Sequence, residues 1–411
     1  MNVQRAATKR DILLLSEQYL PVKGGHVVWL HEVSKRLEGV RVLTGRVRGL
    51  PRRESIEGVN VRRINLSRSW LLRPESAVLY ANLFAQGAKE IMRNRPSVIL
   101  AARALPEGLV AGALGRAFRV PSLVLAHGEE ISPWTPSAPV PARRRITAVA
   151  KGWALWHTYR EISMTVANSH FTRNLLIEGG ISESAIAIVH PGTDPEQYRP
   201  MSRDEALAVQ MGVGGKKVIL TVGRLMWRKG QDMVLQAMPE ILRAVPDVVY
   251  VIAGTGPYES GLRELAATLD VDSHVRFLGE VPFSLLPALY NLADVFVMPN
   301  RVSPRTRDLE GFGIVFLEAN ACGVPVVGGR SGGVPDAVAD GETGLLVDGE
   351  SPAEIAHAII RLLKDPVLAG QMGRSGRERV CRTFTWSQSA EKVGALVARV
   401  AGRPSSRPGV R

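Results

Sequence analysis

Short apolar runs alternate with amphipathic segments along the whole chain, and this alternation restricts the folds that the chain can adopt. In the first half the apolar runs lie at residues 11–16, 40–45, 97–102, 122–127 and 164–169. In the second half they lie at 217–223, 248–254, 275–279, 295–299 and 325–329. Segments with helical periodicity separate them, for example at 26–37, 231–245 and 258–269. Strands rich in β-branched residues that alternate with helices indicate parallel sheets covered on both faces.

The length of 411 residues predicts two domains, because single cores rarely grow beyond about 250–300 residues. The stretch HPGTDPEQYRP at 190–200 is rich in Pro, Gly and Asp, which is typical of a linker. We therefore expect an α/β fold made of two Rossmann-like, doubly wound domains. The expected parts are a first domain over 1–197, a second over 198–380, a C-terminal helix over 381–402 that returns to the first domain, and a disordered tail over 403–411.

Positive charge is concentrated in the first half of the chain. Residues 1–197 carry 27 Lys and Arg against 16 Asp and Glu, a net of +11, and residues 198–411 carry 25 against 23, a net of +2. An excess of this size attracts anionic membranes, nucleic acid or phosphorylated substrates, or it serves solubility alone. Because the sequence has no zinc finger and no RNP-type aromatic pattern, we expect no nucleic-acid partner.

Cysteine usage and the N-terminus favour a reducing, cytoplasmic setting. Cys322 and Cys381 form neither a disulfide framework nor a CxxC metal motif. The first ten residues lack the apolar core of a signal peptide. The apolar run at 12–15 is too short to cross a bilayer.

Glycine-rich junctions that follow strands are the candidate binding sites, because ligands of doubly wound folds bind where strands end and helices begin. Gly24 and Gly25 follow the first strand, where free amides bind phosphate or simply form a tight turn. Arg224 and Lys229 flank a turn in VGRLMWRKGQD at 222–232. This pair suits a diphosphate, or it belongs to a solvated loop.

Two further junctions narrow the chemistry. IAGTGPYESGL at 252–262 is a glycine turn but not the GxGxxG fingerprint with a following acidic residue, which argues against a dinucleotide oxidoreductase. LEGFGIVFLEANACGVPVV at 309–327 holds Glu310 and Glu318 around a very apolar run. Isolated carboxylates are costly to bury, so each needs a partner. Acid–base catalysis, metal binding, binding of polyhydroxyl groups, and the structural alternatives of a helix cap or a salt bridge all remain open at this point.

The motifs VGRLMWRKGQD, GTGP, VRFLG, EGFGIVFLE and SGGVPDAVADGETGLLV occur in an order that strongly resembles retaining glycosyltransferases of family 4 with the GT-B fold. The two glutamates match the E-x7-E signature of that family. The resemblance covers nearly the whole chain and is most specific over 217–350. It implies two domains facing across a cleft, a nucleotide-sugar donor and no catalytic metal or other cofactor.

The resemblance implies a diphosphate site and a ribose site. Arg224 and Lys229 are expected to clamp the donor diphosphate and stabilise the leaving group. Gly24 and Gly25 are expected to direct backbone amides at the same phosphates, and Glu318 is expected to accept hydrogen bonds from the ribose diol.

The resemblance also implies that the sugar binds at the glycine turn EGFG, residues 310–313. Glu310 is expected to hold the sugar hydroxyls, aided by the amides of Phe312 and Gly313. The amides of Ile314 and Val315 are expected to lie near the phosphate.

Two more positions match the family. Arg276, in VRFLG, is expected beside the nucleobase, and His127, in AHGEE at 126–130, is expected near the sugar. Neither glutamate need be a general acid, because retaining members are thought to work by leaving-group stabilisation without a protein nucleophile.

The context RTRDLEGFGIVFLE is most similar to the branch of the family that contains GDP-mannose-dependent phosphatidylinositol mannosyltransferases. It predicts transfer of a hexose, best mannose from GDP-mannose, to a lipid-linked or glycan acceptor in cell-envelope glycan biosynthesis. The alternatives are a transferase that uses UDP-glucose, UDP-galactose or UDP-N-acetylglucosamine, a nucleotide-sugar 2-epimerase, and a non-catalytic binding protein that retains the fold.

A basic segment in the first half bears on the acceptor. ARRRITAVAKGWALWHTYREI at 142–162 combines Arg143, Arg144, Arg145, Lys151 and Arg160 with Trp153 and Trp156. Such a helix binds an anionic bilayer, or its tryptophans pack into the core. The first alternative predicts a peripheral enzyme on the inner face of the plasma membrane.

Overall fold

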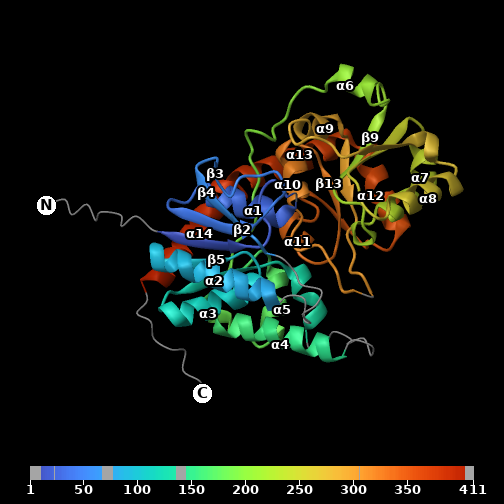
Figure 1. Cartoon of the computed structure of the whole chain (residues 1–411). Helices are drawn as coiled ribbons and strands as arrows, with labels where there is room; N and C mark the ends of the chain where they lie inside the picture. Colours follow the sequence, from blue (N-terminus) through green and yellow to red (C-terminus); the bar gives the residue numbers. More distant parts are fainter. Residues whose placement is uncertain (1–10, 23, 67–76, 136–144, 305, 403–411) are drawn as a thin grey trace. The chain divides into compact units, whose positions relative to one another are not determined.

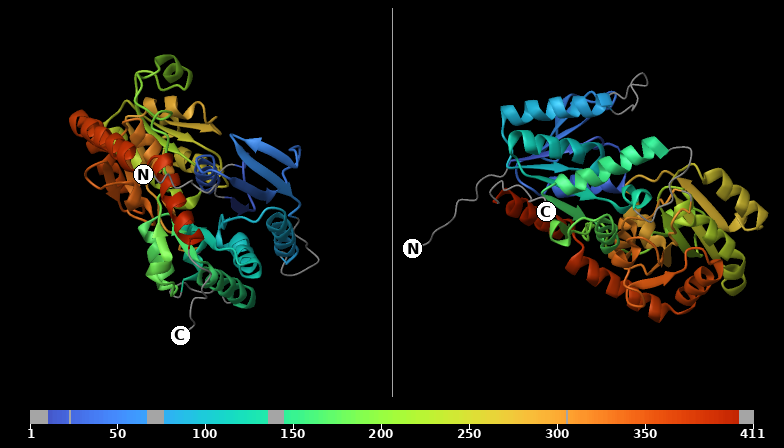
Figure 2. Two further views of the ribbon diagram at one scale, coloured as in Figure 1. Left: turned by 90° about the vertical axis from the view of Figure 1, so that its left-hand side faces the viewer. Right: turned by 90° about the horizontal axis from the view of Figure 1, so that it is seen from below.

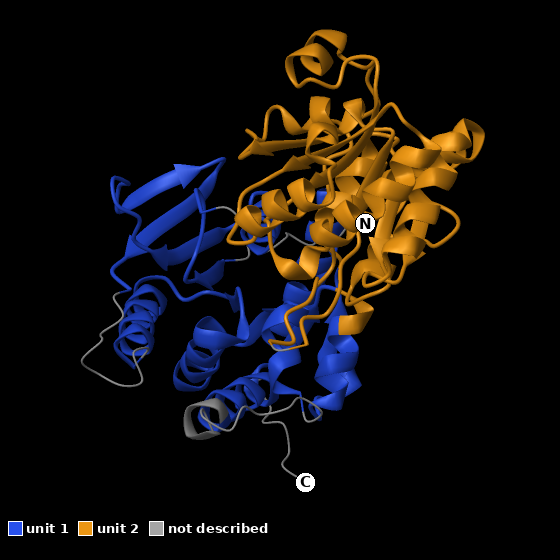
Figure 3. Ribbon diagram, turned by 90° about the vertical axis from the view of Figure 1, so that its right-hand side faces the viewer, with its two compact units in different colours: residues 1–168, 172–189, 386–411 blue, residues 169–171, 190–385 orange. Residues whose placement is uncertain are grey.

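The chain forms two compact units, each with its own parallel sheet. The computed structural model describes residues 11–22, 24–66, 77–135, 145–304 and 306–402. One unit comprises 1–168, 172–189 and 386–411, and the other comprises 169–171 and 190–385 (Figure 3). We call them unit 1 and unit 2.

Unit 1 is built on an eight-stranded sheet in the order β3-β4-β2-β1-β5-β6-β7-β8 (Figure 1). The pairs are parallel except for β3 and β4, which are antiparallel. The strands are β1 (Ile12–Ser16), β2 (Val40–Gly45), β3 (Arg53–Ile56), β4 (Val59–Ile64), β5 (Val98–Ala101), β6 (Ser122–Ala126), β7 (Met164–Ala167) and β8 (Ile186–Ile188).

Helices cover both faces of this sheet. On one face, α3 packs against both α2 and α4, and the three helices lie in a row (Figure 2). On the other face α1 packs against α14, where Trp29 Nε1 donates a hydrogen bond to Ser389 Oγ at 3.0 Å. The helices named here are α1 (Gly25–Ser34), α2 (Ala77–Arg93), α3 (Leu109–Phe118), α4 (Arg145–Glu161), α5 (His170–Glu178), which begins in the 169–171 segment of unit 2, and α14 (Trp386–Ala401).

Unit 2 is built on a six-stranded parallel sheet in the order β11-β10-β9-β12-β13-β14. Alternate residues of a strand face opposite sides, so Leu220 joins one apolar core and Ile219 joins the other. The strands are β9 (Lys217–Val222), β10 (Val248–Ala253), β11 (Val275–Gly279), β12 (Val295–Met298), β13 (Val326–Gly329) and β14 (Gly344–Val347).

The two cores of unit 2 lie under two groups of helices. The first core contains residues of α9, α10, α11 and α13, and the second contains residues of α7, α8 and α12. The helices are α6 (Glu205–Gln210), α7 (Gln231–Ala244), α8 (Glu259–Thr268), α9 (Leu286–Leu292), α10 (Ile314–Ala321), α11 (Val334–Ala337), α12 (Pro352–Lys364) and α13 (Pro366–Thr383). The expectation of two doubly wound α/β folds is therefore confirmed.

The chain passes between the units at other positions than the sequence predicted. The expected boundary at 197/198 corresponds to one at 189/190, and the expected start of the last helix at 381 corresponds to a boundary at 385/386. The proline-rich stretch belongs to unit 2 because Thr193 N donates to Phe384 O at 2.8 Å. Arg377 also donates to the carbonyls of Pro195 and Tyr198, at 3.1 Å each. The expected tail over 403–411 lies outside the described residues.

A close backbone contact joins α13 to the turn that follows α10. A Cβ atom on Gly373 would lie 1.9 Å from the carbonyl oxygen of Gly323. Gly370, one turn earlier on α13, would meet only the flexible end of Arg374, at 3.2 Å.

These two glycines of one helix predict opposite effects on stability. Gly373→Ala should destabilise the protein by about 1–3 kcal/mol because the helix must move away from a backbone atom. Gly370→Ala should stabilise it by about 0.5–1 kcal/mol through helix propensity. Urea unfolding of both variants measures the difference, and equal effects would contradict the packing described here.

Candidate functional site

The N-terminus of α10 is fixed by a glycine in a left-handed conformation. Gly313 has φ 96° and caps the helix, and a Cβ atom there would lie 2.6 Å from the ring of Phe316. The preceding Phe312 is buried and packs against His190 and Phe384, with ring centroids 5.5 and 5.9 Å away. Ile314 and Val315 form the first helical positions, where amides lack carbonyl partners within the helix.

Glu310 is a mostly buried carboxylate, with 14% of its side chain exposed, and two cations hold it just before this helix start. Its Oε2 lies 2.5 Å from Lys229 Nζ and 2.9 Å from Arg228 Nη1. Burial alone would raise its pKa, but the charges and hydrogen bonds of Lys229 and Arg228 outweigh burial and lower the pKa of Glu310 to about 2. The carboxylate is therefore ionised at neutral pH and can only accept hydrogen bonds. It cannot act as a general acid at neutral pH, and the helix cap that was considered for it from the sequence is formed by Gly313, with no side-chain hydrogen bond.

Arg228 is a residue that the sequence reasoning missed. It is 9% exposed, its Nε donates to Asp308 Oδ2 at 2.9 Å, and its Nη1 reaches Glu310. Asn300 Nδ2 adds a longer contact of 3.4 Å to the same glutamate oxygen. The only sequence signal is a second cation directly before Lys229 in WRKG, which by itself looks like ordinary loop charge.

Glu318 lies further along α10 and has neutral partners. Tyr290 Oη donates to its Oε2 at 2.7 Å, and Tyr198 also forms a side-chain hydrogen bond with it. Burial raises the pKa of Glu318 to about 7, and the two tyrosine hydrogen bonds oppose that rise. The salt bridge considered as an alternative for Glu318 is thus found at Glu310, and Glu318 carries a proton that is easily gained or lost.

Arg224 and Lys229 bracket the turn after β9, as the sequence placed them. Lys229 is engaged by Glu310, while Arg224 is exposed and its guanidinium contacts only Met226 Sδ, at 3.8 Å, among the described residues. Gly230 caps α7 at the end of this turn, and Asp232 forms a buried ion pair of 2.6 Å with Arg301.

Arg276 lies on the edge strand β11 of unit 2. Its Nη1 donates to the carbonyls of Ser273 and Val275 at 2.8 and 3.0 Å, and its side chain packs beside Gly212. No contact within the described residues connects it to Glu310 or Glu318. The structure therefore brings Lys229 and Glu310 together, but not Arg276 with them.

In unit 1, His127 ends β6 in a cluster of polar and aromatic side chains. Its Nε2 donates to Ala102 O at 3.0 Å, and its ring lies edge-on to Trp29 and His26 at 5.4 and 5.9 Å. Burial, with the positive charge of Arg103, lowers the pKa of His127 to about 4. The imidazole is therefore neutral, with Nδ1 as its acceptor atom.

Glu130 lies close to this histidine in sequence and structure, because its Oε1 accepts a hydrogen bond from the backbone N–H of His127 at 3.4 Å. Burial raises the pKa of Glu130 to about 8, and Tyr159 Oη donates to it at 2.9 Å. Burial also raises the pKa of Glu107 to about 7.

Elsewhere in unit 1, Gly24 caps α1 and Gly25 is its first residue, so the predicted helix start is confirmed.

The basic helix predicted from the sequence corresponds to α4, and its two tryptophans differ in exposure and in their contacts. Trp153 is 64% exposed and stacks on His157 at 4.8 Å, whereas Trp156 packs over Gly179 and donates to Trp134 O at 2.9 Å. Lys151 lies over the Trp134 ring at 5.3 Å. Arg143 and Arg144 lie outside the described residues. None of the described helices is long and apolar enough to cross a membrane.

One cluster among the described residues has the composition of a metal site. His170 Nδ1 and His190 Nε2 each lie 2.9 Å from Asp336 Oδ2, and the three ligand atoms lie within 4.8 Å of one another. The backbone N–H of His170 donates to the same oxygen at 2.7 Å. Hydrogen bonds from both rings to one carboxylate oxygen account for this geometry without an ion.

Comparisons with known proteins agree with the two-part organisation. A family model described as "Glycosyltransferase Family 4" matches residues 23–197, and one described as "Glycosyl transferases group 1" matches residues 203–379. The solved structure of a protein from Anabaena in complex with UDP superimposes with a TM-score of 0.76. It is 20% identical in sequence, and the alignment covers 95% of this chain and all of that one.

Two curated relatives are more similar in sequence. The first is the GDP-mannose-dependent alpha-(1-6)-phosphatidylinositol monomannoside mannosyltransferase of Mycolicibacterium smegmatis, 38% identical over 64% of this chain and 72% of the relative. The second is the GDP-mannose-dependent monoacylated alpha-(1-6)-phosphatidylinositol monomannoside mannosyltransferase of Corynebacterium glutamicum, 32% identical over 78% of this chain and 81% of the relative.

The contrast between Glu310 and Glu318 predicts a pH signature. A carboxyl whose folded pKa is raised contributes stability below its unfolded pKa and loses it as pH rises through the folded pKa. Between pH 5 and 8 the Glu318→Gln variant should therefore gain about 2–3 kcal/mol of unfolding free energy relative to the unmutated protein.

Glu310→Gln is the matched control for this measurement. In the unmutated protein the pKa of Glu310 is lowered, so the stability that this carboxylate contributes is lost only as pH falls below the unfolded pKa of 4.5. The difference between this variant and the unmutated protein should stay constant from pH 5 to 8. Urea titrations at several pH values test both, and a flat profile for Glu318→Gln would refute the raised pKa.

Proposed function

Because the chain belongs to glycosyltransferase family 4, we propose that it transfers mannose from GDP-mannose, with retention of configuration, to a lipid-linked or glycan acceptor. As a family member with the GT-B fold, the protein is a hexosyltransferase that uses a nucleotide-sugar donor. What we propose beyond this activity is the identity of the donor, the class of acceptor and the role of each residue.

The observation that carries the proposal is the pair of carboxylates formed by Glu310, in the turn before α10, and Glu318, on α10. Glu310 is kept ionised by Lys229 and Arg228, and Glu318 is held by two tyrosine hydroxyls. An ionised carboxylate with free acceptor capacity suits sugar hydroxyls. A buried carboxyl that already accepts from hydroxyl groups suits the ribose diol. Both roles need acceptors of hydrogen bonds, which the two side chains provide.

The chemistry we propose is stabilisation of the departing diphosphate. Lys229 and the exposed Arg224 supply positive charge at the end of β9, and the amides of Ile314 and Val315 point from the start of α10. Fixed charges and amides in a partly buried site lower the energy of a developing oxyanion without reorganisation. The acceptor hydroxyl then attacks from the face that the diphosphate leaves, and no protein nucleophile takes part.

In unit 1 we assign the sugar contact to His127. Since its pKa is lowered to about 4, it acts as a neutral hydrogen-bond partner of a sugar hydroxyl and not as a cation. Gly24 and Gly25 contribute amides at the start of α1 to the diphosphate. Arg276 is assigned to the nucleobase on the resemblance alone, since its present contacts are local.

The choice of GDP-mannose is supported by the two relatives named above, both of which are GDP-mannose-dependent mannosyltransferases. A UDP-sugar donor is the principal alternative, and a nucleotide-sugar 2-epimerase is the second. An epimerase would release UDP and an altered sugar without an acceptor. It would also need catalytic carboxylates at the donor, and the sequence does not show the pattern of an epimerase.

The donor proposal predicts a selective stabilisation by ligand. GDP-mannose at about 100 times its dissociation constant should stabilise the protein by about 2.7 kcal/mol, and the shift should persist in EDTA because no metal takes part. Arg224→Ala should abolish most of the shift and leave the unliganded protein unchanged, since this side chain forms no ion pair within the described residues. Arg243→Ala, on the exposed last turn of α7, is the control.

Thermal unfolding with GDP-mannose, UDP-glucose and UDP-N-acetylglucosamine measures these effects. A shift with a UDP-sugar alone would retain the transferase and refute the mannose donor. Formation of UDP and an epimerised sugar without acceptor would identify the epimerase. No shift with any donor would contradict the site itself.

Peripheral membrane binding through α4 is the proposal for localisation. Trp153, which is mostly exposed and lies on the same helix as the exposed Lys151, should insert at a lipid interface. Trp153→Ala should reduce sedimentation with anionic liposomes at low salt several-fold. Val209→Ala, an exposed apolar side chain on α6 of unit 2, should have no effect. Failure of the unmutated protein to sediment would refute this proposal.

A further inference from the structure

A pocket of about 510 Å³ in unit 1 is lined by five arginines. They are Arg46, which follows β2, Arg52 and Arg53 at the start of β3, and Arg62 and Arg63 on β4. Asn82 on α2 also lines it. The volume lies in the range of small-molecule sites, about 300–1,000 Å³. Five of the 27 Lys and Arg residues of the first half therefore line this one pocket.

The strand register places two of these arginines directly opposite each other. Arg53 on β3 pairs with Arg62 on β4 in the antiparallel ladder. Opposed residues of such a ladder project from the same face, and like charges there are destabilising. The chain therefore keeps an unfavourable pair at this position, which is the behaviour expected of a binding site rather than of a surface selected for stability.

One face of α2 completes the pocket but does not neutralise it. Gln86 accepts a hydrogen bond from Arg62 Nη2 at 3.1 Å, and Glu90, one turn further, pairs with Arg62 Nη1. The same Glu90 also pairs with Arg41 and Arg93, at 3.3 Å each. One carboxylate therefore serves three guanidinium groups.

The remaining arginines differ in their partners. Arg63 is buried and pairs with Glu54 at 2.6 Å. Arg46, Arg52 and Arg53 are exposed, and none of them forms an ion pair within the described residues. Three cationic side chains of the pocket are therefore available to an anion.

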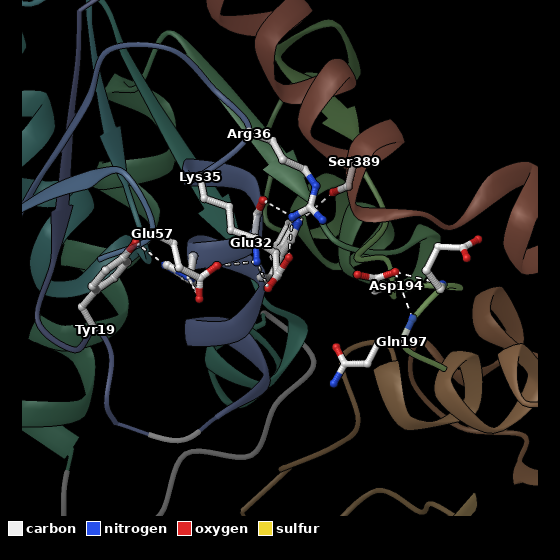
Figure 4. A network of polar contacts seen from close by, with 11 residues as sticks. Tyr19, Glu32, Lys35, Arg36, Glu57, Asp194, Gln197 and Ser389 are labelled. Atoms are coloured by element: carbon white, nitrogen blue, oxygen red, sulfur yellow. Dashed lines mark hydrogen bonds and ion pairs between the residues drawn. The ribbon is translucent and has the colours of Figure 1, made fainter. Parts of the chain in front are cut away.

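A second group of cations in unit 1, formed by Lys35 and Arg36, differs from the pocket because carboxylates neutralise its charges. Lys35 lies between Glu32 and Glu57, 2.8 Å from each, and Arg36 also pairs with Glu32 (Figure 4). Every cation there has a carboxylate partner. The arginine pocket lacks this balance although Glu54 and Glu90 lie on its own elements.

We propose that the arginine pocket binds the phosphate group of a phosphorylated headgroup carried by the acceptor. Guanidinium groups match phosphate oxygens with paired N–H donors, and the amides of Asn82 and Gln86 suit hydroxyl groups beside the phosphate. The inference rests on the proposed function, because it assigns the pocket to the acceptor. The headgroup belongs either to a soluble polyol phosphate or to a lipid, and the two sources share this chemistry.

The test uses the full chain and the double variant Arg46→Gln/Arg53→Gln. Neither side chain has an ion pair within the described residues, and removal of Arg53 relieves the repulsion with Arg62, so the variant should be at least as stable as the unmutated protein. Arg36→Gln/Arg116→Gln removes the same charge from paired arginines of unit 1 and is the control.

Two probes distinguish the sources of the phosphate. Titration calorimetry with inorganic phosphate and with myo-inositol 1-phosphate reports the soluble source. Sedimentation with phosphatidylcholine vesicles, with and without phosphatidylinositol, reports the lipid source. We expect the double variant to lose at least ten-fold in affinity for one of these probes, with the control unchanged. Its KM for the acceptor should rise, while kcat and the thermal shift with the donor remain unchanged.

Each result has a distinct meaning. Loss of phosphate-ester or vesicle binding in the double variant alone supports the pocket and identifies the source. Equal binding by the variant, the control and the unmutated protein overturns it, and so does an equal loss in both variants, which indicates net charge only. If the unmutated protein shows no shift with any donor, the proposed function fails, whatever the phosphate measurements show.

Discussion

The burial of Glu310 between Lys229 and Arg228 is the interaction around which unit 2 is organised. A carboxylate removed from water is destabilising unless charged partners compensate for the lost hydration. Here the compensation comes from the turn after β9, while Glu310 itself belongs to the turn before α10. The ion pairs therefore tie two strand-to-helix junctions of one sheet together. They also hold the two cations in place before any ligand arrives.

Much of this arrangement could be predicted from the sequence. The ten predicted strands correspond to strands of the structure, and most of them are apolar runs that are buried along nearly their whole length. The edge strand β11, of which only Val275 is buried, is the clearest exception. β3, with the sequence RESI, was missed because it is an edge strand with polar and exposed positions. β8 and β14 are short and only partly buried, so they give no strong apolar signal.

The partners of the candidate site were harder to predict than its central residues. Lys229, Glu310 and Glu318 stand in local motifs, and a motif is visible in one sequence. Arg228 and Tyr290 act through contacts with residues 82 and 28 positions away. Such pairings depend on how the strands are ordered in the sheet, and neither spacing nor composition encodes that order. The reversal of roles between the two glutamates, with the ion pair at Glu310, follows from the same cause.

The position of α14 has a consequence for the order in which the protein folds. This helix packs against α1 of unit 1, yet among the helices of the described residues it is the last to be synthesised. Domains generally fold from the N-terminus as they leave the ribosome. Unit 1 must nevertheless wait until residues 190–385 of unit 2 have emerged before the side of α1 that contacts α14 is covered. During that interval this side of α1 is exposed to a chaperone.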